Sequence, residues 1–289
     1  MTKTLQQLWN DGKTILERAG IGEADLDARY LLFHAFSLDA SHFFLDRGKM
    51  LPEDEQTLES IRRYEEMVKK RAERIPLQHI LGTQEFMGLE FDVNENVLIP
   101  RQDTESLVEL VLTECRERDI SLLDMCTGSG CIAISLAKLG GYHQVAAADI
   151  SPKALAVAEK NKEKLGAEVE LVKSDLFDRF DSRRFHVIVS NPPYIPTGVI
   201  ETLEPEVRDH DPVMALDGDE DGLIFYRRLA LESKAHLYSQ GKIYLEIGCD
   251  QGEEVSRIFK EAGYEQVQVF PDATGKDRIV RACWPGQQP

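Results

Sequence analysis

The sequence is short of basic residues, of paired cysteines and of long apolar runs, and each shortage argues against a class of protein. Lys and Arg number 34 against 51 Asp and Glu, a formal net charge of -17, which disfavours nonspecific binding to nucleic-acid phosphates. The five cysteines include no C-x-x-C pair, so neither a disulfide framework nor a zinc site is indicated and no metal is expected. No run approaches the ~18 apolar residues that cross a bilayer, and the amino terminus lacks a secretory core. We therefore expect a cytoplasmic protein.

What remains is a globular composition, with 42% hydrophobic and 29% charged residues among 289, enough for one large domain and a smaller one. Residues 1–75 carry apolar positions at helical spacing, as in TLQQLWNDGKTILERAG, which predicts a small helical bundle. In the linker over 76–99, the segment EFMGLEFDVNENVLI has strand-like residues around Asn94 to Asn96, which predicts a short β-hairpin.

Residues 100–289 show a different sequence pattern, in which short apolar runs alternate with segments of helical periodicity. The runs are SLLDMC, QVAAADI, VELVKSD, HVIVSN, KIYLEIG, VQVF and RIVRACW. This alternation predicts an α/β domain with a doubly wound, mostly parallel sheet. Ligands of such sheets bind beyond the carboxyl ends of the strands, so we look for chemistry there.

The first of these runs leads into a glycine loop, DMCTGSGCIA, in which Gly128 and Gly130 permit a tight turn and a close approach of the backbone to a ligand. Asp149 follows Gly130 by 19 residues and ends the second run. A carboxylate at this spacing binds ribose hydroxyls. Dinucleotides and S-adenosylmethionine both fit this layout.

The charges near the loop favour S-adenosylmethionine. Asp124, Asp149 and Asp175 all fall at predicted strand ends, and these carboxylates attract a sulfonium and an ammonium but repel a pyrophosphate. Each Asp also has a structural alternative: Asp124 could cap a turn, Asp149 could compete with Ser151 to cap the next helix, and Asp175 could close a turn. Leu176 could form an apolar wall for the adenine ring or simply pack in the core.

The fourth run ends in NPPY, residues 191 to 194. Two adjacent prolines lack amide donors and hold a rigid loop whose carbonyls stay free to accept hydrogen bonds. Asn191 adds a side-chain acceptor and Tyr194 an aromatic face. Together these groups suit a planar substrate group that carries an NH2, although the prolines could also serve only to end the strand.

The motifs DMCTGSGCIA, ADIS, SD and NPPY, in this order, resemble the class I S-adenosylmethionine-dependent methyltransferases that act on planar amino groups. QHILG, PRQDTE, DGDEDGLIFY, LEIGCDQG and DATGKDR extend the resemblance, over nearly the whole chain, to the bacterial release factor glutamine methyltransferases. The resemblance implies a seven-stranded class I sheet and a helical domain that recognises the substrate. It also implies methylation of the glutamine side-chain amide in the Gly-Gly-Gln motif of class 1 release factors, with S-adenosylhomocysteine as the second product. The release factor would be the partner of a monomer that makes no direct contact with nucleic acid.

By matching position, the resemblance also assigns residues to the cofactor and to the substrate. The cofactor residues are Asp124, Thr127, Gly128, Ser129, Gly130, Asp149, Asp175, Leu176 and Asn191, with Arg101 and Glu105 bordering the pocket. The substrate amide falls against Asn191, Pro192, Pro193 and Tyr194, of which Asn191, Pro192 and Tyr194 are the expected catalytic residues. Arg101 is equally suited to a structural salt bridge.

The chain departs from the family pattern at two places. Gln102 and Asp103 stand where Pro-Glu is usual, and Asp217 with Gly218 stands where paired glycines are frequent.

Three other functions fit part of the sequence. An adenine methyltransferase acting on DNA or RNA would use the same NPPY loop, but it needs a basic surface for the phosphate backbone. An NAD-dependent oxidoreductase would explain the glycine loop and leave NPPY unexplained. A noncatalytic binding module would need a degraded cofactor site.

Overall fold

The computed structural model of the chain describes residues 3–286. It divides into two compact units. The first takes in the chain up to Gly82 together with Glu204–His210, and the second takes in Thr83–Leu203 and the chain from Asp211 onward. The chain therefore leaves the second unit for seven residues, in the long segment that follows the NPPY loop, and then returns to it.

The first unit is helical, as the sequence predicts. Its helices are α1 (Leu5–Arg18), α2 (Ala24–Phe36), α3 (Ala40–Asp46), α4 (Glu55–Ala72), α5 (Leu77–Leu81) and α10 (Pro205–Arg208). The Thr4 hydroxyl accepts a hydrogen bond from the Gln7 amide at 3.1 Å, while the Gln7 side chain accepts from the Thr4 amide at 2.9 Å. This capping box starts α1. Buried side chains from α1 to α4, including Leu16, Leu31 and Tyr64, form the core of the unit.

Helix α10 is held to this unit by buried charges. Arg71 of α4 donates to Asp27 of α2 at 2.7 Å and to Glu206 of α10 at 2.9 Å. Arg74 adds a second bond to Glu206 at 2.6 Å. Because Arg71 and Asp27 have side chains only 9% and 8% exposed, loss of either partner would leave a buried charge unpaired.

A β-hairpin is present, but its turn lies earlier than the sequence analysis placed it. Strands β1 (Thr83–Phe86) and β2 (Leu89–Asp92) pair antiparallel across a turn at Met87 and Gly88. Both turn residues have positive φ, 53° and 72°, as a two-residue hairpin turn requires. The expected position around Asn94 to Asn96 is wrong. There the Asn94 side chain accepts from the Asn96 amide at 2.9 Å and closes a local Asx turn.

The second unit is built on the predicted mostly parallel sheet. Its strands are β3 (Ser121–Met125), β4 (Gln144–Asp149), β5 (Val169–Lys173), β6 (Phe185–Ser190), β7 (Leu237–Glu246), β8 (Glu265–Pro271) and β9 (Asp277–Trp284). Their order across the sheet is β5-β4-β3-β6-β7-β9-β8. β9 pairs antiparallel with both β7 and β8, and the other neighbouring strands pair parallel. Strand order reverses between β3 and β6, which is the point where ligands bind in such folds.

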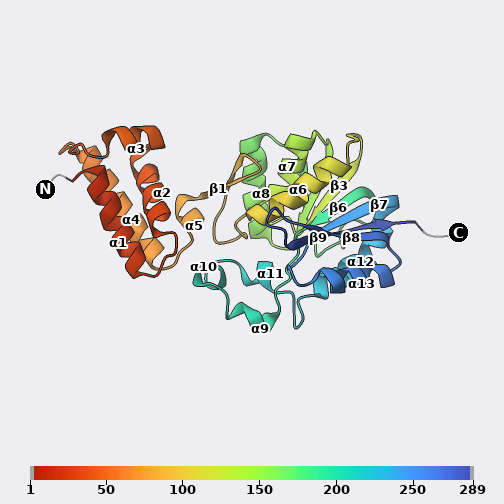
Figure 1. Ribbon diagram of the computed structural model, residues 1–289. Coiled ribbons are helices and arrows are strands. Elements are labelled where there is room, and N and C mark those ends of the chain that lie inside the picture. The colour runs from red at the N-terminus through yellow and green to blue at the C-terminus, as the bar shows by residue number, and fades with distance from the viewer. Residues whose placement is uncertain (1–2, 287–289) are drawn as a thin grey trace. The chain divides into compact units, whose positions relative to one another are not determined.

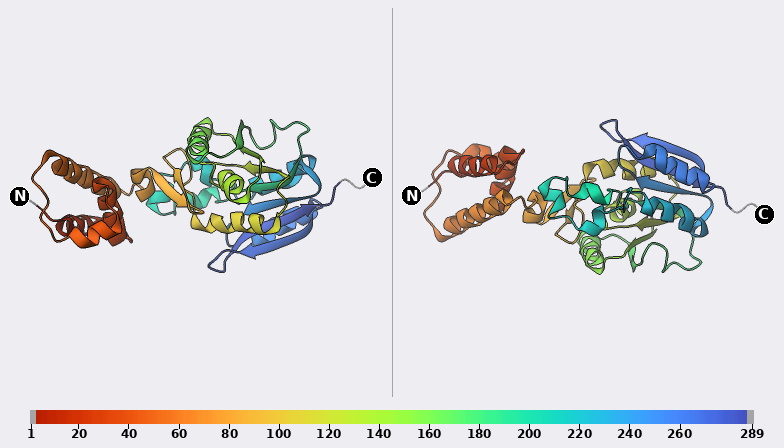
Figure 2. Two further views of the ribbon diagram at one scale, coloured as in Figure 1. Left: turned by 90° about the horizontal axis from the view of Figure 1, so that it is seen from above. Right: turned by 90° about the horizontal axis from the view of Figure 1, so that it is seen from below.

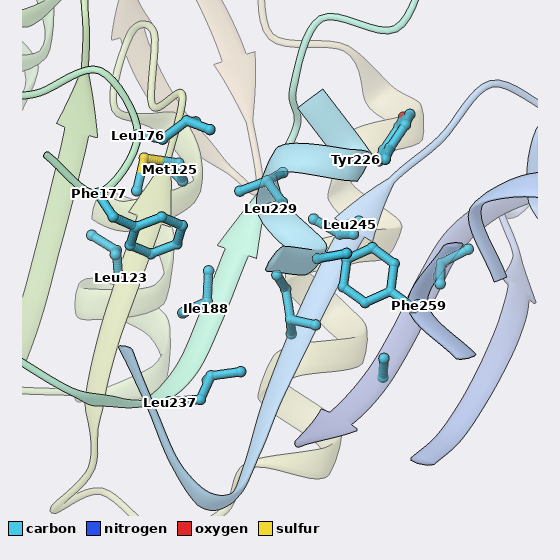
Figure 3. Close-up of a cluster of buried hydrophobic side chains, with 14 of the residues drawn as sticks. Leu123, Met125, Leu176, Phe177, Ile188, Tyr226, Leu229, Leu237, Leu245 and Phe259 are labelled. Atoms are coloured by element: carbon cyan, nitrogen blue, oxygen red, sulfur yellow. The ribbon is translucent and has the colours of Figure 1, made fainter. Parts of the chain in front are cut away.

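Helices cover both faces of this sheet (Figures 1 and 2). They are α6 (Gln102–Glu114), α7 (Cys131–Gly140), α8 (Pro152–Leu165), α12 (Ile224–His236) and α13 (Gly252–Glu261), with short turns α9 (Thr197–Ile200) and α11 (Val213–Leu216) after the NPPY loop. Alternate strand residues point to opposite faces. Leu122 packs with α6 and α7, whereas Leu123 packs with α12 and α13. Figure 3 shows the second of these cores, with Ile188 and Leu245 from the strands facing Leu229 and Phe259 from the helices. In the described part of the chain, no helix is both long and apolar enough to cross a membrane.

Candidate active site

The glycine loop turns sharply between β3 and α7. Gly128 and Gly130 have φ of 55° and 82°, and Cys126 also has a positive φ of 62°. A Cβ at Gly130 would lie 3.2 Å from the Cβ of Ala158 in α8 and 3.0 Å from Ile134. The turn and the close packing of α7 on α8 therefore both require glycine at this position.

Asp124, at the end of β3, is buried behind this loop and forms hydrogen bonds to it. Its carboxylate accepts from the Thr127 hydroxyl at 2.5 Å and from the Ala133 amide at 3.1 Å, which joins the two ends of the loop. Its other oxygen is buried without a hydrogen bond. Burial raises the pKa of Asp124 to about 7. Asp124 therefore ties together the two ends of the glycine loop.

Asp149 faces the loop from the end of β4. One carboxylate oxygen accepts from the Gly128 amide at 2.9 Å and the other from the Ser151 amide at 2.8 Å. Ser151, whose hydroxyl accepts from the Ala154 amide at 3.2 Å, is the N-cap of α8. Asp149 is therefore not the helix cap, and it lines the cavity. Burial raises its pKa, because a desolvated site disfavours the charged form.

A cavity of about 510 Å³ opens beyond the carboxyl ends of β3, β4, β5 and β6, and we call it the strand-end cavity. The predicted site residues that line it are Arg101, Thr127, Gly128, Ser129, Asp149, Asp175, Leu176, Asn191 and Pro193. The predicted residues that do not line it are Glu105, Asp124, Gly130, Pro192 and Tyr194. One continuous cavity thus joins the glycine loop to the NPPY loop.

Other lining residues had no signal in the sequence analysis. They are contributed by the segment after the hairpin, by α11 and by α12, and include Asn96, Val97, Met214, Ala215, Phe225 and Arg228. The placement of Arg228 shows why they were missed. It donates to Asp175 at 2.8 Å, across 53 positions of sequence. Asp175 thus lines the cavity, and its carboxylate forms an ion pair with Arg228. Leu176, which follows it, has a positive φ of 40°.

The NPPY loop follows β6 directly. The Ser190 hydroxyl donates to the Met125 carbonyl at 2.6 Å, which ties the end of β6 to the end of β3. The Asn191 amide nitrogen donates to the Thr104 hydroxyl at 3.4 Å. Within residues 3–286, no hydrogen bond ends on the Asn191 side-chain oxygen or on the Pro192 carbonyl. Both acceptors are therefore unbonded within the described residues, and Asn191 lines the strand-end cavity.

Tyr194 is fixed from both ends. Its hydroxyl donates to Glu246 of β7 at 3.5 Å, and its carbonyl accepts from the Gln251 side chain at 3.0 Å. A Cβ at Gly222 would overlap the same carbonyl oxygen, so the glycine allows the DGDEDG segment to pack on the NPPY backbone. Burial raises the pKa of Tyr194, and its hydroxyl is neutral at physiological pH.

Glu246 is a buried acid that contacts the NPPY loop through Tyr194, and the sequence analysis did not single it out. It is 2% exposed, and its Oε2 atom has no hydrogen-bond partner. Burial raises its pKa to about 7. The one signal for it in the sequence is a single acid within the apolar run IYLEIG. Among the described residues, no group of three or more His, Cys, Asp or Glu side chains could hold a metal ion.

Comparisons with known proteins agree with this arrangement. The family model described as PrmC N-terminal domain matches residues 7–82, and the model described as methyltransferase small domain matches residues 102–203. A release factor glutamine methyltransferase of Geobacter sulfurreducens is 41% identical over 96% of this chain and 95% of its own length. The chain belongs to the release factor glutamine methyltransferase family.

Further relatives support the assignment. The release factor glutamine methyltransferase of Clostridium botulinum is 37% identical over 96% of this chain and 98% of its own length. A crystal structure of a methyltransferase from Pyrococcus furiosus superposes with a TM-score of 0.53 at 19% identity, covering 70% of this chain and 91% of that one. This likeness shows the shared fold alone.

The positions where this chain departs from the family pattern have local structural roles. Asp103 pairs with Arg278 of the DATGKDR motif at 3.0 Å. Asp217 accepts from the Thr197 hydroxyl at 2.7 Å and from the Asp219 amide at 2.9 Å, which closes the loop after α11. Gln102 is the first residue of α6.

Arg101 and Glu105 of the family motif PRQDTE are placed differently. Arg101 lines the strand-end cavity and also pairs with Asp211 at 2.7 Å. Burial raises the pKa of Asp211 to about 6, although the Coulombic effect of Arg101 opposes that rise. Glu105 accepts from the Met87 amide in the hairpin turn at 2.6 Å. It therefore anchors the hairpin outside the cavity.

Proposed function

We propose that this chain transfers a methyl group from S-adenosylmethionine to the side-chain amide nitrogen of the glutamine in the Gly-Gly-Gln motif of peptide chain release factors. The observation that carries the proposal is the pair of unbonded acceptors, the Asn191 side-chain oxygen and the Pro192 carbonyl, in a rigid loop beside the strand-end cavity. Membership of the release factor glutamine methyltransferase family supplies the substrate class.

The lining of the strand-end cavity suits S-adenosylmethionine. The glycine loop lets the backbone approach the ligand closely, and Asp149 offers carboxylate oxygens at the end of β4 for the ribose hydroxyls. Burial raises the pKa of Asp149, and a bound sulfonium and ammonium would favour its charged form. Leu176 and Phe225 add apolar surface for the adenine ring.

The predicted site residues divide into those that would touch the ligands and those that would support them. Thr127, Gly128, Ser129, Asp149, Asp175, Leu176, Arg101 and Asn191 would touch the cofactor. Asp124, Gly130 and Glu105 would hold the loops from behind. Asn191, Pro192, Pro193 and Tyr194 would receive the substrate amide.

An amide nitrogen is a poor nucleophile because its lone pair is delocalised, so the loop must orient it. The Asn191 side-chain oxygen and the Pro192 carbonyl would each accept one of the two amide hydrogens, and the ring of Tyr194 would lie against the amide plane. Well-aligned reactants in such sites gain on the order of 7 to 11 kcal/mol over free encounter.

When bound, S-adenosylmethionine would supply an electrophilic methyl group, and the methyl–sulfur bond would break as the bond to the amide nitrogen forms. The nitrogen then loses one hydrogen as a proton to solvent. Asn191 and Pro192 hold the nitrogen in place until the new bond is made, and no strong base is needed near it.

We further propose that the enzyme is a cytoplasmic monomer that binds the release factor through its helical unit, without direct contact to nucleic acid. The net charge of -17 opposes the approach of phosphate backbones.

The proposal is tested by offering unmodified release factor and unmethylated DNA side by side with labelled S-adenosylmethionine. Label on the release factor, and none on a release factor whose Gly-Gly-Gln glutamine is replaced by glutamate, is the expected result. Label on the DNA would support the adenine methyltransferase instead.

A further inference from the structure

We propose that Arg228 is a positioning residue, which holds Asp175 so that the strand-end cavity selects a purine base carrying an amino group over one carrying an oxygen at the same place. The inference rests on the proposed function and deepens it, because it names the residue that decides which base the cofactor must have. It starts from the order of the strands and from one ion pair.

The order of the strands indicates where the base of the cofactor would lie. Strands β5, β4, β3 and β6 are neighbours in this order. The proposed function places the methyl group at the NPPY loop after β6 and the ribose at Asp149 after β4. Adenine and the sulfur are attached to opposite ends of the ribose, so the base would lie toward the end of β5. Asp175 and Leu176 line the cavity there.

The backbone at the end of β5 is fixed to the end of β4. The Ser174 amide donates to the Asp149 carbonyl at 3.0 Å, and the Ser174 hydroxyl accepts from the Arg179 amide at 3.1 Å. The side chain of Asp175, by contrast, is 45% exposed, and an exposed side chain can occupy several rotamers. The direction of its carboxylate therefore depends on a partner.

Arg228 of α12 is that partner, and it is itself held at two points. Its Nη1 atom donates to Oδ1 of Asp175 at 2.8 Å, and its Nε atom donates to Glu232, one turn later on the same helix, at 2.9 Å. Because the guanidinium is planar, two acceptors on different nitrogens fix its plane. Arg228 and Phe225, three positions apart on α12, both line the cavity.

The ion pair occupies only one oxygen of Asp175. Among residues 3–286, no hydrogen bond or ion pair ends on Oδ2 of this side chain. A carboxylate oxygen can accept hydrogen bonds and cannot donate them. Oδ2 would therefore accept a hydrogen from the amino group of adenine, and it would repel the oxygen that hypoxanthine carries at that place.

Loss of Arg228 would remove this selection without removing the carboxylate. A site that is built to hydrogen-bond one group of a ligand rejects an analogue that lacks the group, because its own polar atom is then left unpaired. This rejection requires that the polar atom stay in place. Without Arg228, Asp175 is free to turn into solvent, and the cavity would then bind the two bases with similar affinity.

The test measures the Kd of S-adenosylhomocysteine and of S-inosylhomocysteine by calorimetry, without release factor. The wild type should bind the adenosyl compound at least about thirtyfold more tightly, as expected for a hydrogen bond to a charged group. In Arg228→Met, which keeps most of the apolar stem, the two affinities should lie within about threefold of each other. Arg228→Lys keeps a charge that can pair with Asp175 and should restore most of the preference.

Kinetics give a second readout that a merely structural role would not produce. In Arg228→Met, KM for S-adenosylmethionine should rise about tenfold while kcat at saturating cofactor changes less than about twofold, because the base lies far from the reacting methyl group. General damage to the fold would instead lower kcat together with the midpoint of thermal unfolding.

The matched control is Arg227→Met, the same substitution at the neighbouring position of α12. Arg227 donates to Asp221 at 3.1 Å, so this variant also loses an ion pair with an aspartate, but Arg227 is not among the residues that line the cavity. It should keep both the wild-type preference for the adenosyl compound and the wild-type KM.

The outcomes separate this inference from the proposed function. If Arg228→Met keeps the wild-type ratio of affinities, or if the wild type binds both compounds equally, the positioning role is wrong, whether or not release factor is methylated. If the wild type prefers the adenosyl compound and Arg228→Met does not, the inference holds. It then holds even where release factor receives no methyl group, a result by which the proposed function alone would fail.

Discussion

The carboxylate of Asp149 accepts a hydrogen bond from the amide of Gly128 at 2.9 Å, so the end of β4 and the glycine loop after β3 form one surface of the strand-end cavity. The Asp149 carboxylate thus holds the glycine loop by a hydrogen bond, and it also lines the cavity, where a ligand can contact it. Replacing it should affect cofactor binding more than folding.

Asp149→Ala should weaken binding of S-adenosylmethionine by at least tenfold, because the ribose loses its carboxylate partner. Asp149→Asn keeps an acceptor for the Gly128 amide and loses the charge, so it should fall between Ala and wild type. Calorimetric titration measures all three. Equal affinities for the three proteins would contradict the assignment of Asp149 to the cofactor.

Gly130→Ala should destabilise the second unit by roughly 2 to 4 kcal/mol, because the alanine would have both a positive φ and a contact with Ala158. Gly141→Ala is the matched control, since Gly141 has a φ of 65° and nothing within 4 Å of its added Cβ. It should cost only ~1 kcal/mol. Urea unfolding gives both values, and equal losses would show that the packing of α7 on α8 does not need the glycine.

Stability should fall as pH rises from about 4 to about 7. Burial raises the pKa of Asp124 from 3.8 to about 7, so within this window the folded protein holds a proton that the unfolded chain has released. The stabilisation is complete below the pKa that Asp124 has in the unfolded chain. It is lost as pH rises through the pKa that Asp124 has in the folded protein.

Asp124→Asn should lose less stability than wild type between pH 4 and pH 7, with a difference in the free energy of unfolding of roughly 2 to 4 kcal/mol. It should not remove the slope, because Glu246 and Asp211 also have pKa values raised by burial, to about 7 and about 6. Urea unfolding at several pH values measures the difference. The same slope in wild type and variant would mean that Asp124 is ionised throughout.

Asn191→Ala should reduce methyl transfer at least a hundredfold while the midpoint of thermal unfolding stays near that of wild type. The side chain of Asn191 makes one hydrogen bond of 3.4 Å within the protein, so its removal costs the fold little, whereas the substrate amide loses an acceptor. Transfer is followed by labelled methyl incorporation into release factor. Activity within twofold of wild type would exclude the orienting role.

The sequence predicts most of the fold because its signals are local. All seven strands of the large sheet coincide with apolar runs, and the glycine loop, Asp149 and the NPPY loop were placed at strand ends by their own sequence. The hairpin was expected around Asn94 to Asn96 and lies earlier, because nothing in the sequence marks the positive φ of Met87.

Contacts between distant segments could not be predicted from one sequence. Glu206 forms ion pairs with Arg71 and Arg74 of the helical unit, more than 130 positions earlier. Glu246 is a single acid in an apolar strand, and its contact with the Tyr194 hydroxyl joins residues 52 positions apart in the sequence. Such residues become visible once the chain is folded.

The measurement that tests the central claim most directly is localisation of the methyl group on the product. Unmodified release factor is incubated with the enzyme and S-adenosylmethionine carrying an isotopically labelled methyl group, and the protein is fragmented in a mass spectrometer. We predict that the label lies on the side-chain amide nitrogen of the Gly-Gly-Gln glutamine and on no other residue. Label on another residue, or none on the release factor, would contradict the function proposed for this chain.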